Sequence, residues 1–143
     1  MDLQGISVII ACFLSVYLGI FTAILAEEEL KDALKYLRVF QNLLITLTSY
    51  VLFYPYIKLY AILVSIAVLL VMFNFKSIRR DLWIYPILGI VIGVNSSIMM
   101  VTLVFLYGFP SGSILYEKFK NKAYIQTFYY ISFIFMAIVV SYL

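Results

Sequence analysis

The residues best able to do chemistry in this chain form one charged group and one neutral group. The charged group is expected to lie at a membrane interface and comprises Glu27, Glu28, Glu29, Asp32, Arg79, Arg80 and Asp81. Converging carboxylates can bind a divalent cation, and arginines can bind a phosphate. Because Lys31, Lys35 and Arg38 follow the first acids directly, we expect those acids to form a solvated helix N-terminus. We assign no catalytic and no metal-binding residue.

The neutral group lies within a long apolar stretch and comprises Gly89, Gly93, Asn95, Ser96 and Ser97. Glycines four residues apart let two helix backbones approach closely in a membrane, and amide or hydroxyl side chains can hydrogen-bond across such an interface. An amide in hydrocarbon without a hydrogen bond is costly. We therefore expect these residues to hold helices together, with a polar pocket in a permeation path as the alternative.

Two residue types that support common chemistries are scarce. The chain has no histidine, the commonest metal ligand and the commonest general base at neutral pH. Its one cysteine, Cys12, excludes an intrachain disulfide or a dithiol pair. We expect no cofactor. The net charge of +3 comes from short basic clusters without a continuous basic stripe, which argues against a nucleic-acid partner.

The elements that position these residues follow from the composition. Of the 143 residues, 66% are hydrophobic and 12% are charged, whereas a typical soluble domain is about 45–50% apolar and about 25% charged. A water-soluble fold of this length could not hide so much apolar surface, but a bilayer removes that requirement. The sequence predicts an all-α, polytopic integral membrane helical bundle that forms a single domain over residues 1–143.

Five apolar stretches predict transmembrane helices, because about 20 apolar residues cross the hydrocarbon core as a helix. They cover residues of about 5–25, 39–54, 57–75, 82–107 and 123–143. Pro55 separates the second from the third, since proline disfavours helix at the preceding residue; the alternative is a re-entrant hairpin over 40–73. Residues 26–39 predict an interfacial amphipathic helix before the second span. The Pro-, Gly- and Lys-containing segment 108–122 predicts a polar loop.

A row of small residues also marks the first predicted span. Ala11, Ser15, Gly19 and Ala23 occur at every fourth position. This spacing places them on one helix face. We expect that face to pack against the fourth span or against a neighbouring subunit.

The basic residues between the spans predict the orientation. With five spans, one side carries Lys31, Lys35, Arg38, Lys76, Arg79 and Arg80. The other side carries Lys58, Lys118, Lys120 and Lys122. Loops rich in Lys and Arg stay in the cytoplasm. We expect a multi-pass plasma-membrane protein, and the small excess favours an N-terminus outside and a C-terminus in the cytoplasm.

These patterns favour a small non-catalytic membrane protein: a subunit, assembly factor or scaffold of a membrane complex. Its expected partners are the lipid bilayer and other membrane protein chains, or further copies of itself. A small oligomeric transporter or channel is the first alternative, with Asn95 to Ser97 along its path. A membrane enzyme acting on a lipid or isoprenoid is the second, with the charged group as its only candidate site.

Overall fold

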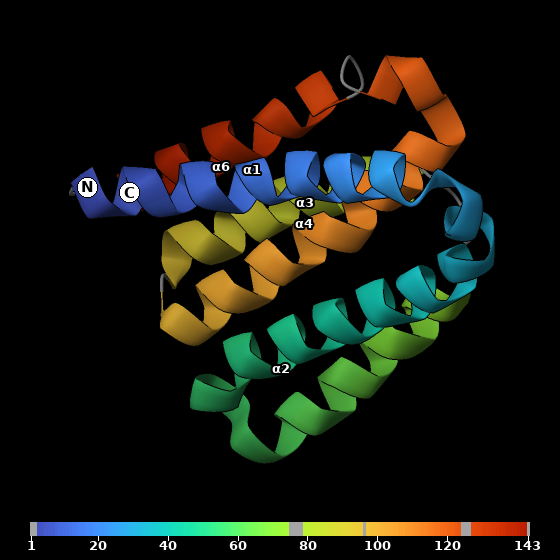
Figure 1. Ribbon diagram of the computed structural model, residues 1–143. Helices are drawn as coiled ribbons and strands as arrows, with labels where there is room; N and C mark the ends of the chain where they lie inside the picture. Colours follow the sequence, from blue (N-terminus) through green and yellow to red (C-terminus); the bar gives the residue numbers. More distant parts are fainter. Residues whose placement is uncertain (1–2, 75–78, 96, 124–126, 143) are drawn as a thin grey trace.

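The chain forms a bundle of helices in the computed structural model, which describes residues 3–74, 79–95, 97–123 and 127–142 (Figure 1). Side chains are described at these positions except at 3, 4, 59, 79–82, 121, 128 and 129. In chain order the elements are α1 (Leu3–Leu25), α2 (Glu27–Asn74), α3 (Arg79–Val94), α4 (Ile98–Phe119), the 3₁₀ helices η1 (Lys120–Lys122) and η2 (Thr127–Tyr130), and α6 (Ile131–Ser141). The predicted all-α helical bundle is confirmed for the described residues.

Two helical segments are long and apolar enough to cross a membrane: Gly5–Leu25 and Ile98–Phe119. Three shorter apolar segments accompany them: Tyr60–Asn74, Trp83–Val94 and Ile131–Ser141. The predicted bundle of five spans is therefore not confirmed. Gly5–Leu25 coincides with the first predicted span, whereas Ile98–Phe119 crosses the boundary between the span predicted over 82–107 and the loop predicted over 108–122.

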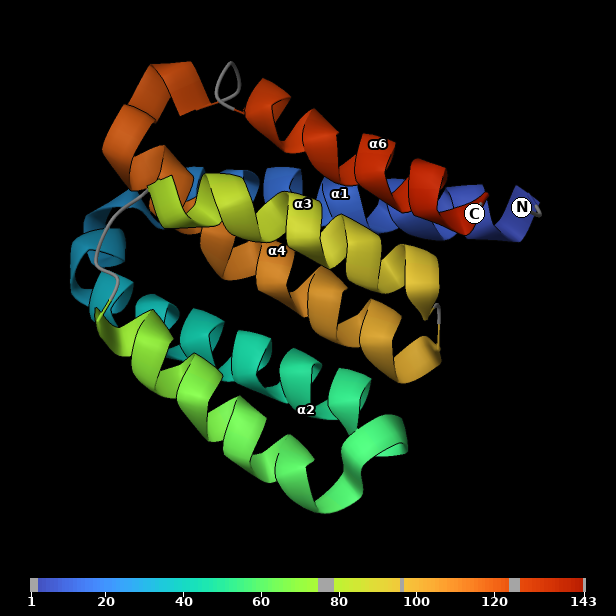
Figure 2. The ribbon, with the colours of Figure 1, turned by 180° about the vertical axis from the view of Figure 1, so that it is seen from behind.

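The long helix α2 reverses direction near its middle (Figures 1 and 2). Lys58 has non-helical dihedral angles, with φ of 21° and ψ of −82°, and Pro55 lies just before it. Proline removes a backbone donor, and a positive φ breaks the regular helix, so the chain bends here. We call residues 27–57 the inner arm and residues 60–74 the outer arm of α2. The bend lies where the sequence predicted a division between 39–54 and 57–75.

The structure corrects the single helix expected over 82–107. Helix α3 ends at Val94, and α4 begins at Ile98 and runs back along the bundle. The side chain of Asn95 accepts a hydrogen bond from the backbone N–H of Ser97 at 3.1 Å, and the Ser97 hydroxyl accepts one from that of Met100 at 3.4 Å. Asn and Ser compete with helical hydrogen bonding in this way, which explains the break. Ser96 lies outside the described residues.

The structure also corrects the loop expected over 108–122. Helix α4 continues through Gly108 and Pro110 to Phe119, and η1 follows it. Tertiary packing overrides the turn preferences of these residues, because the segment is buried against α1. The C-terminal α-helix is shorter than the predicted 123–143: it covers Ile131–Ser141 after η2, and residues 124–126 lie outside the described part.

The core forms where α1 packs on α4 and where α3 packs on α6, with the inner arm of α2 against α4. The α1–α4 contact depends on glycines. A Cβ atom at Gly112 would overlap the carbonyl oxygen of Val16, and one at Gly19 would overlap that of Phe109. Ser15 and Gly19 of the row of small residues in α1 therefore pack against α4, on the segment predicted to be a loop, whereas Ala11 of the same row is exposed. Ser113 adds a hydrogen bond from its hydroxyl to the Gly19 carbonyl at 3.0 Å.

Candidate functional site

One end of the bundle collects most of the charged side chains. The C-terminus of α1, both ends of α2, the N-terminus of α3 and the C-terminus of α4 meet there (right-hand side of Figure 1). We call this the charged end. Its described charged side chains are Glu27, Glu28, Glu29, Lys31, Asp32, Lys35, Arg38, Glu117, Lys118, Lys120 and Lys122. Among the described side chains, Lys58 at the bend of α2 is the one charge at the opposite end.

An ion pair joins two helix ends within the charged end. Lys120 Nζ lies 3.2 Å from Glu27 Oε1, and the Tyr116 hydroxyl donates to Glu27 Oε2 at 3.5 Å. The hydrogen bond and the charge of Glu27 raise the pKa of Lys120. Because the side chains are 59% and 49% exposed, solvent screens the pair and its contribution to stability is small. The pair positions the end of α4 beside the start of α2.

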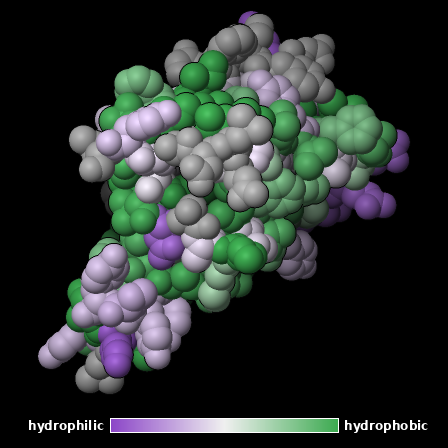
Figure 3. Space-filling model, turned by 90° about the vertical axis from the view of Figure 1, so that its left-hand side faces the viewer, coloured by the Kyte–Doolittle hydropathy of each residue, from purple (hydrophilic) through white to green (hydrophobic). Residues whose placement is uncertain are grey.

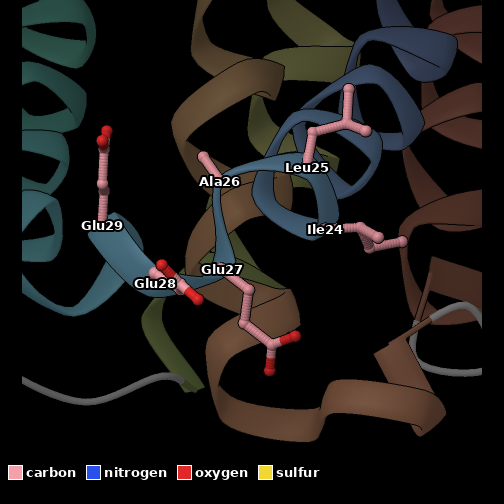
Figure 4. Close-up of a pocket in the computed structure, with 6 residues that line it drawn as sticks. All are labelled: Ile24, Leu25, Ala26, Glu27, Glu28 and Glu29. Carbon is pink, nitrogen blue, oxygen red and sulfur yellow. The ribbon is translucent and has the colours of Figure 1, made fainter.

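An open pocket of about 470 Å³ lies between α1 and α2 and is lined by Ile24, Leu25, Ala26, Glu27, Glu28 and Glu29 (Figure 4). Figure 4 shows the three carboxylates pointing in different directions from the start of α2. No group of three or more acidic or cysteine side chains able to hold a metal ion occurs among the described residues. A cation site needs converging oxygen ligands, and the three glutamates do not provide one.

The other members of the predicted charged group are only partly described. Asp32 is exposed in the second turn of α2. Arg79, Arg80 and Asp81 form the first turn of α3, so their backbone begins at the charged end. Their side chains lie outside the described part of the structure. The fold thus brings both predicted segments to one end of the bundle.

A second polar centre lies inside the bundle, between the inner arm of α2 and α4. Gln41 is 0% exposed, and its amide nitrogen Nε2 donates to Tyr107 Oη at 3.0 Å and to Ser111 Oγ at 2.9 Å. The Ser111 hydroxyl donates to the backbone carbonyl of Tyr107 at 2.9 Å. Two helices are thereby joined through neutral groups that satisfy one another in the interior. We call Gln41, Tyr107 and Ser111 the polar latch.

Aromatic side chains extend the polar latch toward α3 and α6. The rings of Tyr85 and Tyr130 are 4.3 Å apart between centroids, and Tyr85 lies 5.6 Å from Tyr107 and 5.9 Å from Phe133. All four rings are buried. Tilted and edge-on pairs at these distances are favourable contacts of aromatic rings. The cluster fills the centre of the bundle, so helices α2, α3, α4 and α6 share one continuous packed interior.

The structure separates the neutral group that the sequence predicted. Gly89 and Gly93 face α6: a Cβ at Gly89 would overlap the Phe133 carbonyl oxygen, and one at Gly93 would lie 2.8 Å from Val140 Cβ. Asn95 and Ser97 lie in the connection between α3 and α4, where their side chains bond to local backbone N–H groups. They are therefore turn and capping residues at one end of the bundle, and not at mid-depth in a helix.

Sequence reasoning missed the polar latch and the second glycine pair. The signals for both were present. Gln41 and Asn42 are adjacent amides at the start of a long apolar stretch, where a buried amide requires a partner. Gly108 and Gly112 repeat the four-residue spacing of Gly89 and Gly93. Pro110 lies between them and favours a loop when the residues are judged locally.

The chemistry open to this interior is limited. Besides the buried tyrosines, the buried polar side chains of the described residues are neutral: Ser15, Gln41, Asn42, Thr48, Ser65, Ser111, Ser113 and Thr127. Several of these hydroxyls bond to a carbonyl of their own helix, as in Thr48 to Leu44 and Ser65 to Ala61. The Thr127 hydroxyl instead donates to the Tyr17 hydroxyl at 2.7 Å, which joins η2 to α1. The Thr127–Tyr17 bond therefore fixes η2 relative to α1.

Comparison with known proteins yields no match: no family model, curated protein or solved structure is significantly similar to the chain.

Proposed function

We propose that this chain is a multi-pass integral membrane protein that serves as a non-catalytic subunit, assembly factor or scaffold of a plasma-membrane complex. The observation that carries the proposal is the contrast between interior and surface. The interior is closely packed and neutral, while large apolar side chains cover the outside of every described α-helix.

The outward-facing side chains support a lipid environment. They include Phe21 in α1, Leu63 in α2, Trp83 in α3, Ile98 in α4 and Phe135 in α6, with Trp83 74% and Ile98 87% exposed. Single exposed apolar residues are normal in soluble proteins, but large exposed apolar side chains on every described α-helix are not. Helices also satisfy their own backbone hydrogen bonds, as lipid requires.

The interior supports a packing role over transport. A permeation path needs space and polar groups that face it. The α1–α4 contact leaves no room even for a Cβ atom at Gly19, Gly108 or Gly112. In the polar latch, the amide nitrogen of Gln41 bonds to side chains of α4. The polar groups at the bundle centre therefore serve helix contacts.

The charged end supports a membrane enzyme less well than it supports a scaffold. The carboxylates of the three glutamates point in different directions (Figure 4), and that of Glu27 forms an ion pair with Lys120. Carboxylates that bind a metal or a phosphorylated substrate through a metal would need to share one centre. The transporter and the lipid enzyme thus rank below the scaffold.

Gentle purification tests the proposal. The protein is extracted in mild detergent from native membranes, or from its host carrying an affinity tag, and everything bound is identified by mass spectrometry. We expect a membrane protein chain in a fixed ratio, or a defined homo-oligomer. Recovery as a lone monomer under several mild detergents would contradict the scaffold role. A matched purification with Leu63→Ser on the exposed outer arm then tests whether that face contributes to the contact.

A further inference from the structure

The connection between α3 and α4 decides which side of the molecule the last basic cluster occupies. If 82–107 were one helix, Lys118, Lys120 and Lys122 would lie at the end opposite to Lys35 and Arg38. The break at Asn95 and Ser97 sends the chain back instead. Lys120 consequently reaches Glu27, the first residue of α2, at 3.2 Å. The ion pair thus places the segment after α4 beside the start of α2.

This reversal concentrates the positive charge of the whole molecule. The chain has ten Lys and Arg residues. Lys58 lies at the bend of α2, and Lys76 lies outside the described residues. The remaining eight belong to segments that meet at the charged end: Lys31, Lys35, Arg38, Arg79, Arg80, Lys118, Lys120 and Lys122. The sequence predicted six basic residues on one side and four on the other. Among the described positions, eight basic residues belong to segments at the charged end and one lies at the opposite end.

Among the described side chains, the opposite end carries one charge, that of Lys58. Figure 3 views the molecule from this end, and green or pale atoms make up most of the face, with small purple patches. Exposed Tyr54 and Tyr56 lie at the bend of α2, and tyrosine is enriched at membrane–water interfaces. Exposed Trp83 near the start of α3 provides an interfacial aromatic close to the charged end. Both ends thus carry interfacial aromatics, but one carries nearly all of the basic residues.

Helices α1 and α4 are long enough to separate the two ends by a bilayer, whereas α3 and α6 are shorter. At about 1.5 Å per residue, the 23 residues of α1 extend about 34 Å and the 22 residues of α4 about 33 Å, while the 16 residues of α3 extend about 24 Å and the 11 residues of α6 about 16 Å. The hydrocarbon core is about 30 Å thick, and a short segment can be accommodated by local thinning. Counting the two arms of α2 separately, α1, α2, α3, α4 and α6 supply six segments that run between the ends.

We infer that the chain crosses the membrane six times, with the charged end against the anionic lipid surface of the cytoplasmic leaflet. Lys- and Arg-rich connections are retained in the cytoplasm, and anionic headgroups attract basic side chains there. The start of α1 and the end of α6 then lie together on the outer side, since both are at the opposite end. This keeps the expected outside position of the N-terminus and moves the C-terminal helix end to the same side. The inference depends on the proposed insertion in a membrane.

Site-directed labelling tests this orientation. Single cysteines replace Ser97 and Tyr56 at one end, and Lys35 and Lys118 at the other. Cys12 is buried, so the unaltered protein serves as the control for background labelling. Intact cells are treated with a membrane-impermeant maleimide, which is quenched before lysis; a second sample is permeabilised first. We expect Ser97→Cys and Tyr56→Cys to react in intact cells, and Lys35→Cys and Lys118→Cys to react only after permeabilisation.

Three results would overturn the inference, and they are distinguishable. Labelling of Lys118→Cys but not Lys35→Cys in intact cells would restore the five-span arrangement. Labelling of both lysine sites but neither of the others would invert the molecule. Recovery of the protein in the soluble fraction would instead overturn the membrane insertion on which the proposed function depends. Two sites at each end keep the result interpretable where one variant fails to accumulate.

Discussion

Gln41 shows how one side chain can join two helices in an apolar interior. Its amide nitrogen donates to the hydroxyls of Tyr107 and Ser111, which joins the inner arm of α2 to α4. Loss of the amide would leave two hydroxyls with fewer partners in a buried setting. Interhelical bonds of this kind in membranes contribute about 0.6 kcal/mol on average and up to about 1.7 kcal/mol.

We expect Gln41→Leu to lower the free energy of unfolding in detergent by about 1 kcal/mol. Asn74→Leu is the matched control, because that amide is exposed and its nitrogen donates to the Leu70 carbonyl of its own helix. In a double-mutant cycle with Ser111→Ala, the two losses should not add. Fully additive losses would show that the polar latch does not couple the inner arm of α2 to α4.

Gly112 tests the close contact of α1 with α4. A valine there cannot fit against the Val16 carbonyl without moving a backbone. Overpacking of a core typically costs about 1–3 kcal/mol. We expect Gly112→Val to lower the midpoint of thermal unfolding clearly, as measured by circular dichroism in detergent. Ala11→Val on the exposed face of α1 should leave the midpoint nearly unchanged; equal effects at both positions would contradict the packing.

The Lys120–Glu27 pair has a pH dependence of known sign. The folded protein has a raised Lys120 pKa, so the pair's stabilisation is complete below the ordinary lysine pKa and is lost as pH rises through the folded value. The difference in unfolding midpoint between the unaltered protein and Lys120→Gln should therefore be small at neutral pH and vanish at strongly alkaline pH. High salt should also remove it. A difference in unfolding midpoint that grows as the pH rises would contradict a stabilising Lys120–Glu27 pair.

Among the elements, the α3–α4 connection is where the predicted and observed structures differ most. Hydropathy indicates which residues avoid water, and residues 82–107 are apolar almost throughout, so length alone suggested one helix. The break depends on Asn95 and Ser97, whose short polar side chains can serve a helix interface or a turn equally well. Sequence pattern does not separate those uses, because the choice depends on which segments lie alongside.

The N-cap of α4 at Ser97 can be tested by substitution. We expect Ser97→Ala to destabilise the protein by about 1 kcal/mol, because the Met100 N–H loses its acceptor. Ser97→Asp retains an acceptor at the cap and should preserve the unfolding midpoint. If alanine and aspartate were equally destabilising, Ser97 would act through something other than the cap.

The segment 108–122 was mispredicted for a related reason. Gly108 and Pro110 are turn residues when judged locally, yet they lie inside α4 because α1 packs against them. Pro110 costs α4 a backbone hydrogen bond, and burial of the surrounding side chains compensates. By contrast, the bend of α2 lies close to Pro55, where the sequence predicted a division, and Lys58 there has non-helical dihedral angles.

At the scale of the whole molecule, composition predicted the helical class and the apolar surface, since both are sums over many residues. The placement of the charged residues could not be predicted, because it depends on whether an odd or an even number of helical segments separates one charged cluster from the next. One additional reversal moves Lys118, Lys120 and Lys122 to the other end. The polar latch was likewise inaccessible, since Gln41 and Ser111 are brought together only by the packing of α2 on α4.

The central claim is that lipid surrounds the apolar side chains on the outside of the bundle. The most direct measurement is fractionation of expressing cells, with the membranes washed in alkaline carbonate and then treated with detergent. The account predicts that the protein stays in the carbonate-washed pellet and is released only by detergent. A monodisperse monomer that remains in solution without detergent would contradict it.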